Sequence, residues 1–106
     1  MIIVTTENIA GYKIVECLGT VVGNTIRARH LGKDIVAGLK TLIGGEISEY
    51  TKMLAESREQ SLNRMIKQAE HLDADAIVGI RFQTSMIMTA TAELLVYGTA
   101  VKLEKS

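Results

Sequence analysis

A basic cluster follows the first long β-rich segment of the chain. Its members are Arg27, Arg29, His30 and Lys33. The cluster lies where a strand is expected to end and a helix to begin, so free backbone N–H groups would add to the charge of the guanidinium groups. This combination would bind a carboxylate or a phosphate. A solvated charged edge, or ion pairs between subunits, would explain the same residues, and both interpretations stay open.

Side chains that could bind a metal ion are few and widely spaced. The candidates are Cys17, His30, His71, Asp73 and Asp75. One cysteine cannot close a disulfide within the chain, and it cannot complete a structural zinc site, which takes four ligands. The last three candidates fit a helix end and the turn behind it. A cyclic oligomer brings the same side chain from every subunit around one axis, so Cys17 and His30 could form a site that no single chain contains.

The remaining motifs give no catalytic arrangement. Ser57, Ser61 and Ser85 have no neighbouring histidine or aspartate in a nucleophile pattern, and no nucleotide-binding glycine motif is present. Met86 and Met88 have thioethers that could bind a soft cation, but both share the parity of the expected core. That parity favours packing under a helix. We therefore expect a protein that is not an enzyme.

The composition indicates one small and apolar domain over residues 1–106. Hydrophobic residues make up 47% of the chain, and twelve basic residues balance twelve acidic ones. A net charge of zero gives no field that would attract nucleic acid or an anionic membrane. No apolar stretch reaches the ~20 residues of a membrane-spanning helix, and the first residues lack a basic segment typical of export signals. With a single cysteine, a cytoplasmic protein is expected.

Hydrophobic periodicity predicts the elements that position these side chains. Apolar residues at helical spacing predict a short helix over 33–43, and a segment free of glycine and proline predicts a long helix over 49–72. The apolar stripe of the long helix is interrupted at Ser57, Arg58 and Ser61. Strands are expected over 1–5, 76–88 and 91–103, and residues 12–28 are expected to form either one sharply bent strand or two strands. The order ββααββ predicts an α+β fold of two layers, an antiparallel sheet with the long helix on one face.

The strand patterns predict which faces are buried. One parity of the third strand is apolar and is expected to form the core under the long helix: Ala76, Val78, Ile80, Phe82, Met86 and Met88. The fourth strand is apolar on both parities, so the face of the sheet away from the helices would stay bare and is expected to contact another subunit. Gly19 and Gly23 interrupt the second strand, which is typical of a bulge or a close backbone approach.

Several separated blocks resemble the YbjQ-type family of small bacterial and archaeal proteins. They are NTIRARH at 24–30, GGE at 44–46 with EYT at 49–51, ADAIVGIRF at 74–82 and YGTA at 97–100. The resemblance covers nearly the whole chain. It implies a dodecin-like subunit, assembly into a pentameric ring, and a family described as heavy-metal-binding with no established activity.

These inferences combine into one expected function. We expect a homo-oligomeric binding protein, pentameric by the resemblance, with no nucleic-acid or membrane partner. Its ring would present Arg27, Arg29, His30 and Arg81 to a small anion or to a neighbouring subunit. A divalent or soft metal ion would be bound by Cys17 and His30 across subunits. The alternative is a structural or stress-associated scaffold that binds no small molecule.

Overall fold

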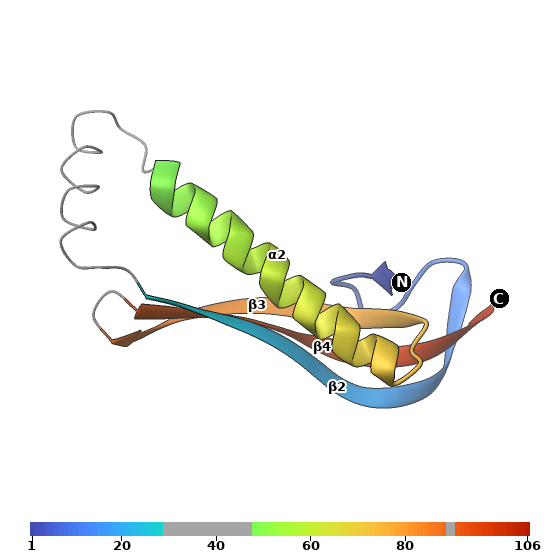
Figure 1. Cartoon of the computed structure of the whole chain (residues 1–106). Helices are drawn as coiled ribbons and strands as arrows, with labels where there is room; N and C mark the ends of the chain where they lie inside the picture. The colour runs from blue at the N-terminus through green and yellow to red at the C-terminus, as the bar shows by residue number, and fades with distance from the viewer. Residues whose placement is uncertain (29–47, 89–90) are drawn as a thin grey trace.

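The structure, a computed structural model, describes residues 1–28, 48–88 and 91–106 (Figure 1). Its elements are β1 (Ile2–Ile3), β2 (Tyr12–Ala28), α2 (Ser48–His71), β3 (Ala76–Met88) and β4 (Thr91–Lys105). The predicted long helix and the four predicted strands are confirmed. The short helix predicted over 33–43 lies outside the described residues. No helix in the described ranges combines the length and apolar character that a membrane span requires.

The four strands form one mixed sheet in the order β1-β3-β4-β2. β4 pairs antiparallel with both β3 and β2. β1 pairs with β3 in parallel, with Ile2 opposite Ala76 and Ile3 opposite Ile77. The prediction of a wholly antiparallel sheet is therefore wrong for β1. A parallel pair needs a long crossover connection, and the chain between β1 and β3, which includes β2 and α2, provides one.

Helix α2 covers one face of the sheet. Its fully buried Met65 and Ala69 pack against Val21, Ile77, Ile80, Val96 and Ala100 of three strands. Burial decreases toward the N-terminal end of the helix, where Leu54 is 44% exposed. In Figure 1 the C-terminal half of α2 lies close to the sheet, and its first turns stand farther away. The architecture is thus one helix on a four-stranded mixed sheet, with the main core under the C-terminal half of the helix.

A bulge at Gly79 breaks the predicted alternation of β3. The register with β4 shifts between Val78 and Arg81, and Gly79 has a φ of 64°. Because one extra residue reverses the direction of every following side chain, Ile77 and Ile80 both face α2. Ala76 and Val78 instead belong to a second cluster on the opposite face, covered by the N-terminal segment. The prediction of one core parity along β3 is wrong.

The predicted burial of the methionines in β3 is also wrong. Met86 is 81% exposed and Met88 is 63% exposed. Both lie at the end of the sheet where β3 and β4 are connected, beyond Ser57 and Leu94, the last buried residues of α2 and β4 in that direction. A second register shift falls between the two methionines. The long helix therefore leaves this end of the sheet uncovered.

The glycines of β2 have the roles that the sequence indicates. A register shift lies between Cys17 and Gly19. At Gly23, a Cβ atom would collide with the backbone carbonyl oxygen of Ser61 and would lie 2.6 Å from the backbone nitrogen of Met65. Gly23 therefore permits the closest approach between the helix and the sheet.

The face of β2 and β4 away from α2 is apolar and exposed. Val22 and Ile26 of β2 are 43% and 57% exposed, and Tyr97, which lies opposite Val22 in β4, is 37% exposed. We call these three residues the bare face. Their exposure agrees with the expectation that helices on one side leave the other side of the sheet apolar and uncovered.

Side chains of α2 protect the outer edge of β2. The backbone N–H of Val22 donates to Oε1 of Gln68 at 2.7 Å, and Nη1 of Arg64 donates to the backbone oxygen of Asn24 at 2.5 Å. These groups would otherwise be available to another strand, since β2 is an edge strand of the described sheet, with β4 beside it. A second chain would therefore find few free backbone groups for strand pairing in the middle of this edge. The bare face, in contrast, is open for packing against another subunit.

Candidate functional site

Of the predicted basic site residues, the described part of the chain includes Arg27 and Arg81, and these two lie on opposite faces of the sheet. Arg27 lies opposite Ala92 on the face of the sheet that carries α2, whereas Arg81 lies opposite Tyr97 on the other face. Arg29 and His30 lie outside the described residues. Within one chain, the structure therefore separates Arg27 from Arg81, and a site that contains both would need a second subunit.

Each of these two arginines has partners within the chain. Nη2 of Arg27 donates to Oε1 of Gln60 in α2 at 2.7 Å. Nη1 of Arg81 donates to the backbone oxygens of Thr5 and Ile80, both at 2.8 Å. Because Thr5 follows β1, Arg81 holds the N-terminal segment against β3. Arg81 thus links the N-terminal segment to β3 within one chain.

Cys17 is exposed, and it lies opposite Val101 of β4. Eleven positions separate it from Ala28 at the end of β2, which corresponds to about 35 Å of extended strand. His30 is two residues further along the chain, and two residues span at most about 7 Å. The two proposed metal ligands therefore cannot meet within one chain. Among the described residues, no three His, Cys, Asp or Glu side chains form a group that could hold a metal ion.

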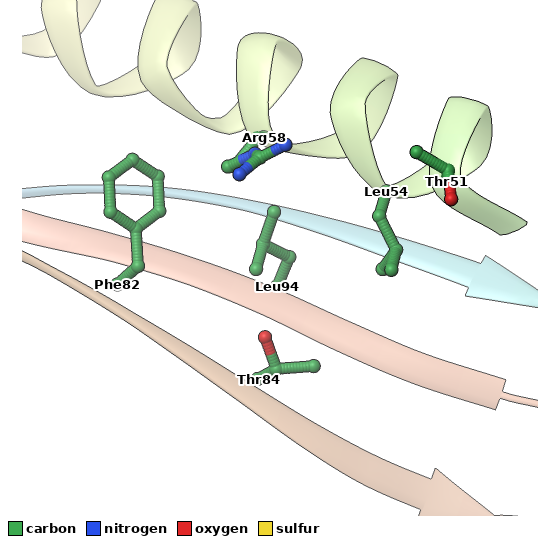
Figure 2. A pocket seen from close by; sticks show the side chains of 6 residues that line it. All are labelled: Thr51, Leu54, Arg58, Phe82, Thr84 and Leu94. Atoms are coloured by element: carbon green, nitrogen blue, oxygen red, sulfur yellow. The ribbon is translucent and has the colours of Figure 1, made fainter. Parts of the chain in front are cut away.

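A groove of about 330 Å³ lies between the first half of α2 and the sheet (Figure 2). Its lining residues are Thr51, Leu54 and Arg58 of α2, Phe82 and Thr84 of β3, and Leu94 of β4. Figure 2 shows Leu54 and Arg58 on the sheet side of the helix, with Phe82 and Leu94 below them. The volume is within the range of small-molecule sites, and the lining combines apolar side chains with one guanidinium group and two hydroxyls.

A smaller cavity of about 10 Å³ adjoins the groove, because Leu54, Thr84 and Leu94 line both. This inner cavity also has Arg27 and Ser57 in its lining. Nε of Arg27 and Oγ of Ser57 are buried and have no hydrogen-bond partner in the described part of the chain. Buried polar atoms without partners are rare in folded proteins. The inner cavity is large enough for one water molecule or one ligand oxygen.

The hydroxyls near Ser57 show how the helix packs at this point. Oγ of Ser61 lies 2.8 Å from Oγ1 of Thr25 and donates to the backbone oxygen of Leu94 at 3.2 Å. Thr25 in turn donates to the backbone oxygen of Ser57 at 3.2 Å. The small side chains let α2 approach the backbone of β2 above Gly23. These bonds satisfy Thr25 and Ser61, whereas Oγ of Ser57 has no partner in residues 1–28, 48–88 and 91–106.

None of the described residues that line the groove was in the predicted site. Arg27, which lines the inner cavity, was among the predicted ligand contacts. Ser57 and Arg58 appeared in the sequence as an interruption of the apolar stripe of the long helix, and this interruption is the signal that indicates a polar opening between helix and sheet. Phe82 was expected in the core, but it is 43% exposed at the groove.

Comparison with known proteins places the chain among uncharacterised relatives. A family model described as "Putative heavy-metal-binding" matches residues 1–104. A UPF0145 protein of Thermosipho africanus is 58% identical over 106 residues, which cover 100% of this chain and 98% of the relative. A UPF0145 protein of Methanosarcina acetivorans is 56% identical over 103 residues, covering 97% of each chain.

A solved structure supports the fold. The crystal structure of a protein of unknown function from Pediococcus pentosaceus, of the DUF74 family, superimposes with a TM-score of 0.71. The alignment covers 98% of both chains at 19% sequence identity. At this identity the likeness shows the shared α+β architecture alone.

Proposed function

The chain belongs to the YbjQ family, and from this premise we propose that it is a non-enzymatic, homo-oligomeric binding protein for a heavy-metal ion or a small anion. The subunit is dodecin-like in this proposal, and the assembly is a cytoplasmic pentameric ring. The observation that carries the proposal is the bare face: Val22, Ile26 and Tyr97 form an exposed apolar surface on the side of the sheet that α2 does not cover. Association removes such surfaces from water.

Metal binding in this proposal takes place between subunits. Cys17 is exposed on β2, and a thiolate is the ligand that soft ions such as Cu(I) and Cd²⁺ prefer. Because Cys17 and His30 of one chain are too far apart, each metal ion would be held by Cys17 of one subunit and His30 of another. Ring symmetry would then create one such site for each pair of neighbouring subunits.

Calorimetry with purified protein tests the metal site. Zn²⁺, Cu⁺ or Cd²⁺ is titrated into the wild type and into a Cys17→Ser, His30→Ala double variant. We expect one metal ion per subunit in the wild type and loss of this uptake in the double variant. His71→Ala is the control, because His71 is exposed at the end of α2 and is not part of the proposed site. Equal uptake by the wild type and the double variant would remove Cys17 and His30 as ligands.

A scaffold without a small ligand is the second candidate function. The hydrogen bonds of Arg81 to Thr5 and Ile80, and that of Arg27 to Gln60, favour it, because both arginines already have partners within the chain. Native mass spectrometry of protein purified without chelator distinguishes the two functions. Retained metal on the oligomer supports the binding protein, whereas a metal-free oligomer that takes up no added metal supports the scaffold.

A further inference from the structure

We propose that the groove between α2 and the sheet binds a small amphipathic anion, an aromatic body that carries one carboxylate or sulfonate group. All the residues that carry this inference belong to one chain. It therefore depends neither on the proposed ring nor on the proposed metal site.

The apolar part of the ligand would lie on Phe82, Leu54 and Leu94. Phe82 is 43% exposed and Leu54 is 44% exposed, although both are on the side of the sheet that α2 covers. A planar ring placed in the groove would bury both side chains and could stack on Phe82. The groove, at about 330 Å³, has room for one or two fused rings.

Arg58 gives the groove its preference for an anion. Its guanidinium group lies between the helix and the sheet in Figure 2, at the groove that it lines. A guanidinium group binds a carboxylate or sulfonate through two parallel hydrogen bonds. Arg27 adds a second positive charge in the adjoining inner cavity, where Glu93 is the acidic residue of the lining. Oε2 of Glu93 already accepts a hydrogen bond from Nδ2 of Asn24 at 3.0 Å.

The inner cavity provides the second, independent indication of a ligand. Ser57 is 2% exposed, and its Oγ has no partner among the described residues, nor does the buried Nε of Arg27. Both atoms can donate a hydrogen bond, and donors without partners are costly in a buried position. One oxygen of the anionic group, or a water molecule bound to it, would fit the cavity of about 10 Å³ and satisfy both donors.

The groove itself favours an anion over a metal ion. Among the residues that the structure describes, its lining has no carboxylate, imidazole or thiolate side chain, the groups that bind divalent and soft cations. The polar groups around it are guanidinium and hydroxyl groups, which donate hydrogen bonds to oxygen anions.

Two fluorescent probes test the proposal. 8-Anilinonaphthalene-1-sulfonate has the aromatic body and the anionic group, and N-phenyl-1-naphthylamine has the same body without the charge. We expect Arg58→Gln to lower the affinity for the sulfonate probe about tenfold, since the loss of one charge-assisted hydrogen bond lowers an affinity by about one power of ten. The neutral probe should be unaffected by this change. Phe82→Ala should lower the affinity for both probes. Lys67→Gln, on the exposed side of α2, is the matched charge control.

A second variant separates binding from folding. Ser57→Ala removes a hydroxyl that has no partner among the described residues, so the midpoint of urea unfolding should be unchanged or slightly higher. The same variant should bind the sulfonate probe about threefold more weakly. A Ser57→Ala variant that is stable and binds as the wild type does would remove the inner cavity from the site.

Amide chemical shifts locate the probe and exclude adsorption to the bare face. Binding in the groove should shift the resonances of Phe82 and Thr84, whereas adsorption to the bare face would shift those of Val22 and Tyr97. The proposal is overturned if the shifts are confined to the bare face, if Arg58→Gln binds the sulfonate probe as tightly as Lys67→Gln, or if the sulfonate probe does not bind.

Discussion

At the scale of single residues, Gly23 determines how closely α2 approaches the sheet. The atoms that a Cβ would meet are backbone atoms of Ser61 and Met65, which cannot move aside by rotating a side chain. We expect Gly23→Ala to lower the free energy of unfolding by about 3 kcal/mol, the upper end of the usual cost of overpacking. Urea denaturation followed by circular dichroism measures this loss.

Thr20→Ala is the matched control for this prediction. Thr20 is exposed on the same strand and lies opposite Thr99, on the face away from α2. This substitution should change the free energy of unfolding by no more than about 0.5 kcal/mol. If Gly23→Ala is as stable as Thr20→Ala, the close contact between α2 and β2 is contradicted.

The sequence predicted single residues best where their role depends on near neighbours in the chain. Gly19 and Gly23 were predicted to mark a bulge or a close approach, and both predictions are confirmed. Distant strands surround the hydroxyl of Ser57, which has no partner among the described residues. No pattern of neighbouring residues in the sequence could therefore indicate that this hydroxyl is buried without a partner. The separation of Cys17 from the end of β2, in contrast, follows from the predicted length of the strand itself.

At the scale of elements, the bulge at Gly79 decides which side chains of β3 face the helix. A φ of 64° is rarely adopted by residues with a Cβ atom, and apart from Gly79 and its two chain neighbours no described residue has an atom within 4 Å of the Cβ position. We therefore expect Gly79→Ala to lower the free energy of unfolding by about 1 kcal/mol through backbone strain alone. Urea denaturation measures it. Gly79→Asn should lower the free energy of unfolding by less, because asparagine tolerates a positive φ better than alanine does. Equal stability of both variants and the wild type would contradict the proposed backbone strain.

The extent of each element was more predictable than its partners. The strand over 12–28 and the strand over 76–88 have the predicted bounds, and α2 begins and ends one residue earlier than predicted. These bounds depend on local composition and periodicity. The parallel pairing of β1 and the bulge in β3 depend on contacts between distant segments, and one extra residue at the bulge reverses the alternation that the sequence prediction followed.

At the scale of the whole molecule, the bare face and the protected edge of β2 indicate how copies of the chain would associate. The edge already has hydrogen bonds to Gln68 and Arg64 of α2, whereas Val22 and Ile26 are exposed. Contact through the face is therefore favoured over pairing of strands at this edge. We expect a Val22→Glu, Ile26→Glu double variant to dissociate at micromolar concentration, because charged groups in an apolar contact lose their hydration. Sedimentation velocity measures the change in mass.

The folded state of this double variant should persist, since both substituted side chains point away from the core under α2. Its far-ultraviolet circular dichroism should match that of the wild type, and Lys67→Glu, on the exposed side of α2, should leave the oligomer intact. A double variant that sediments as the wild-type oligomer would exclude the bare face as the contact. A wild type that is itself a folded monomer at micromolar concentration would overturn the homo-oligomeric function. The described lining residues of the groove all belong to one chain, so the groove would still bind its anion in that case, and the two proposals fail independently.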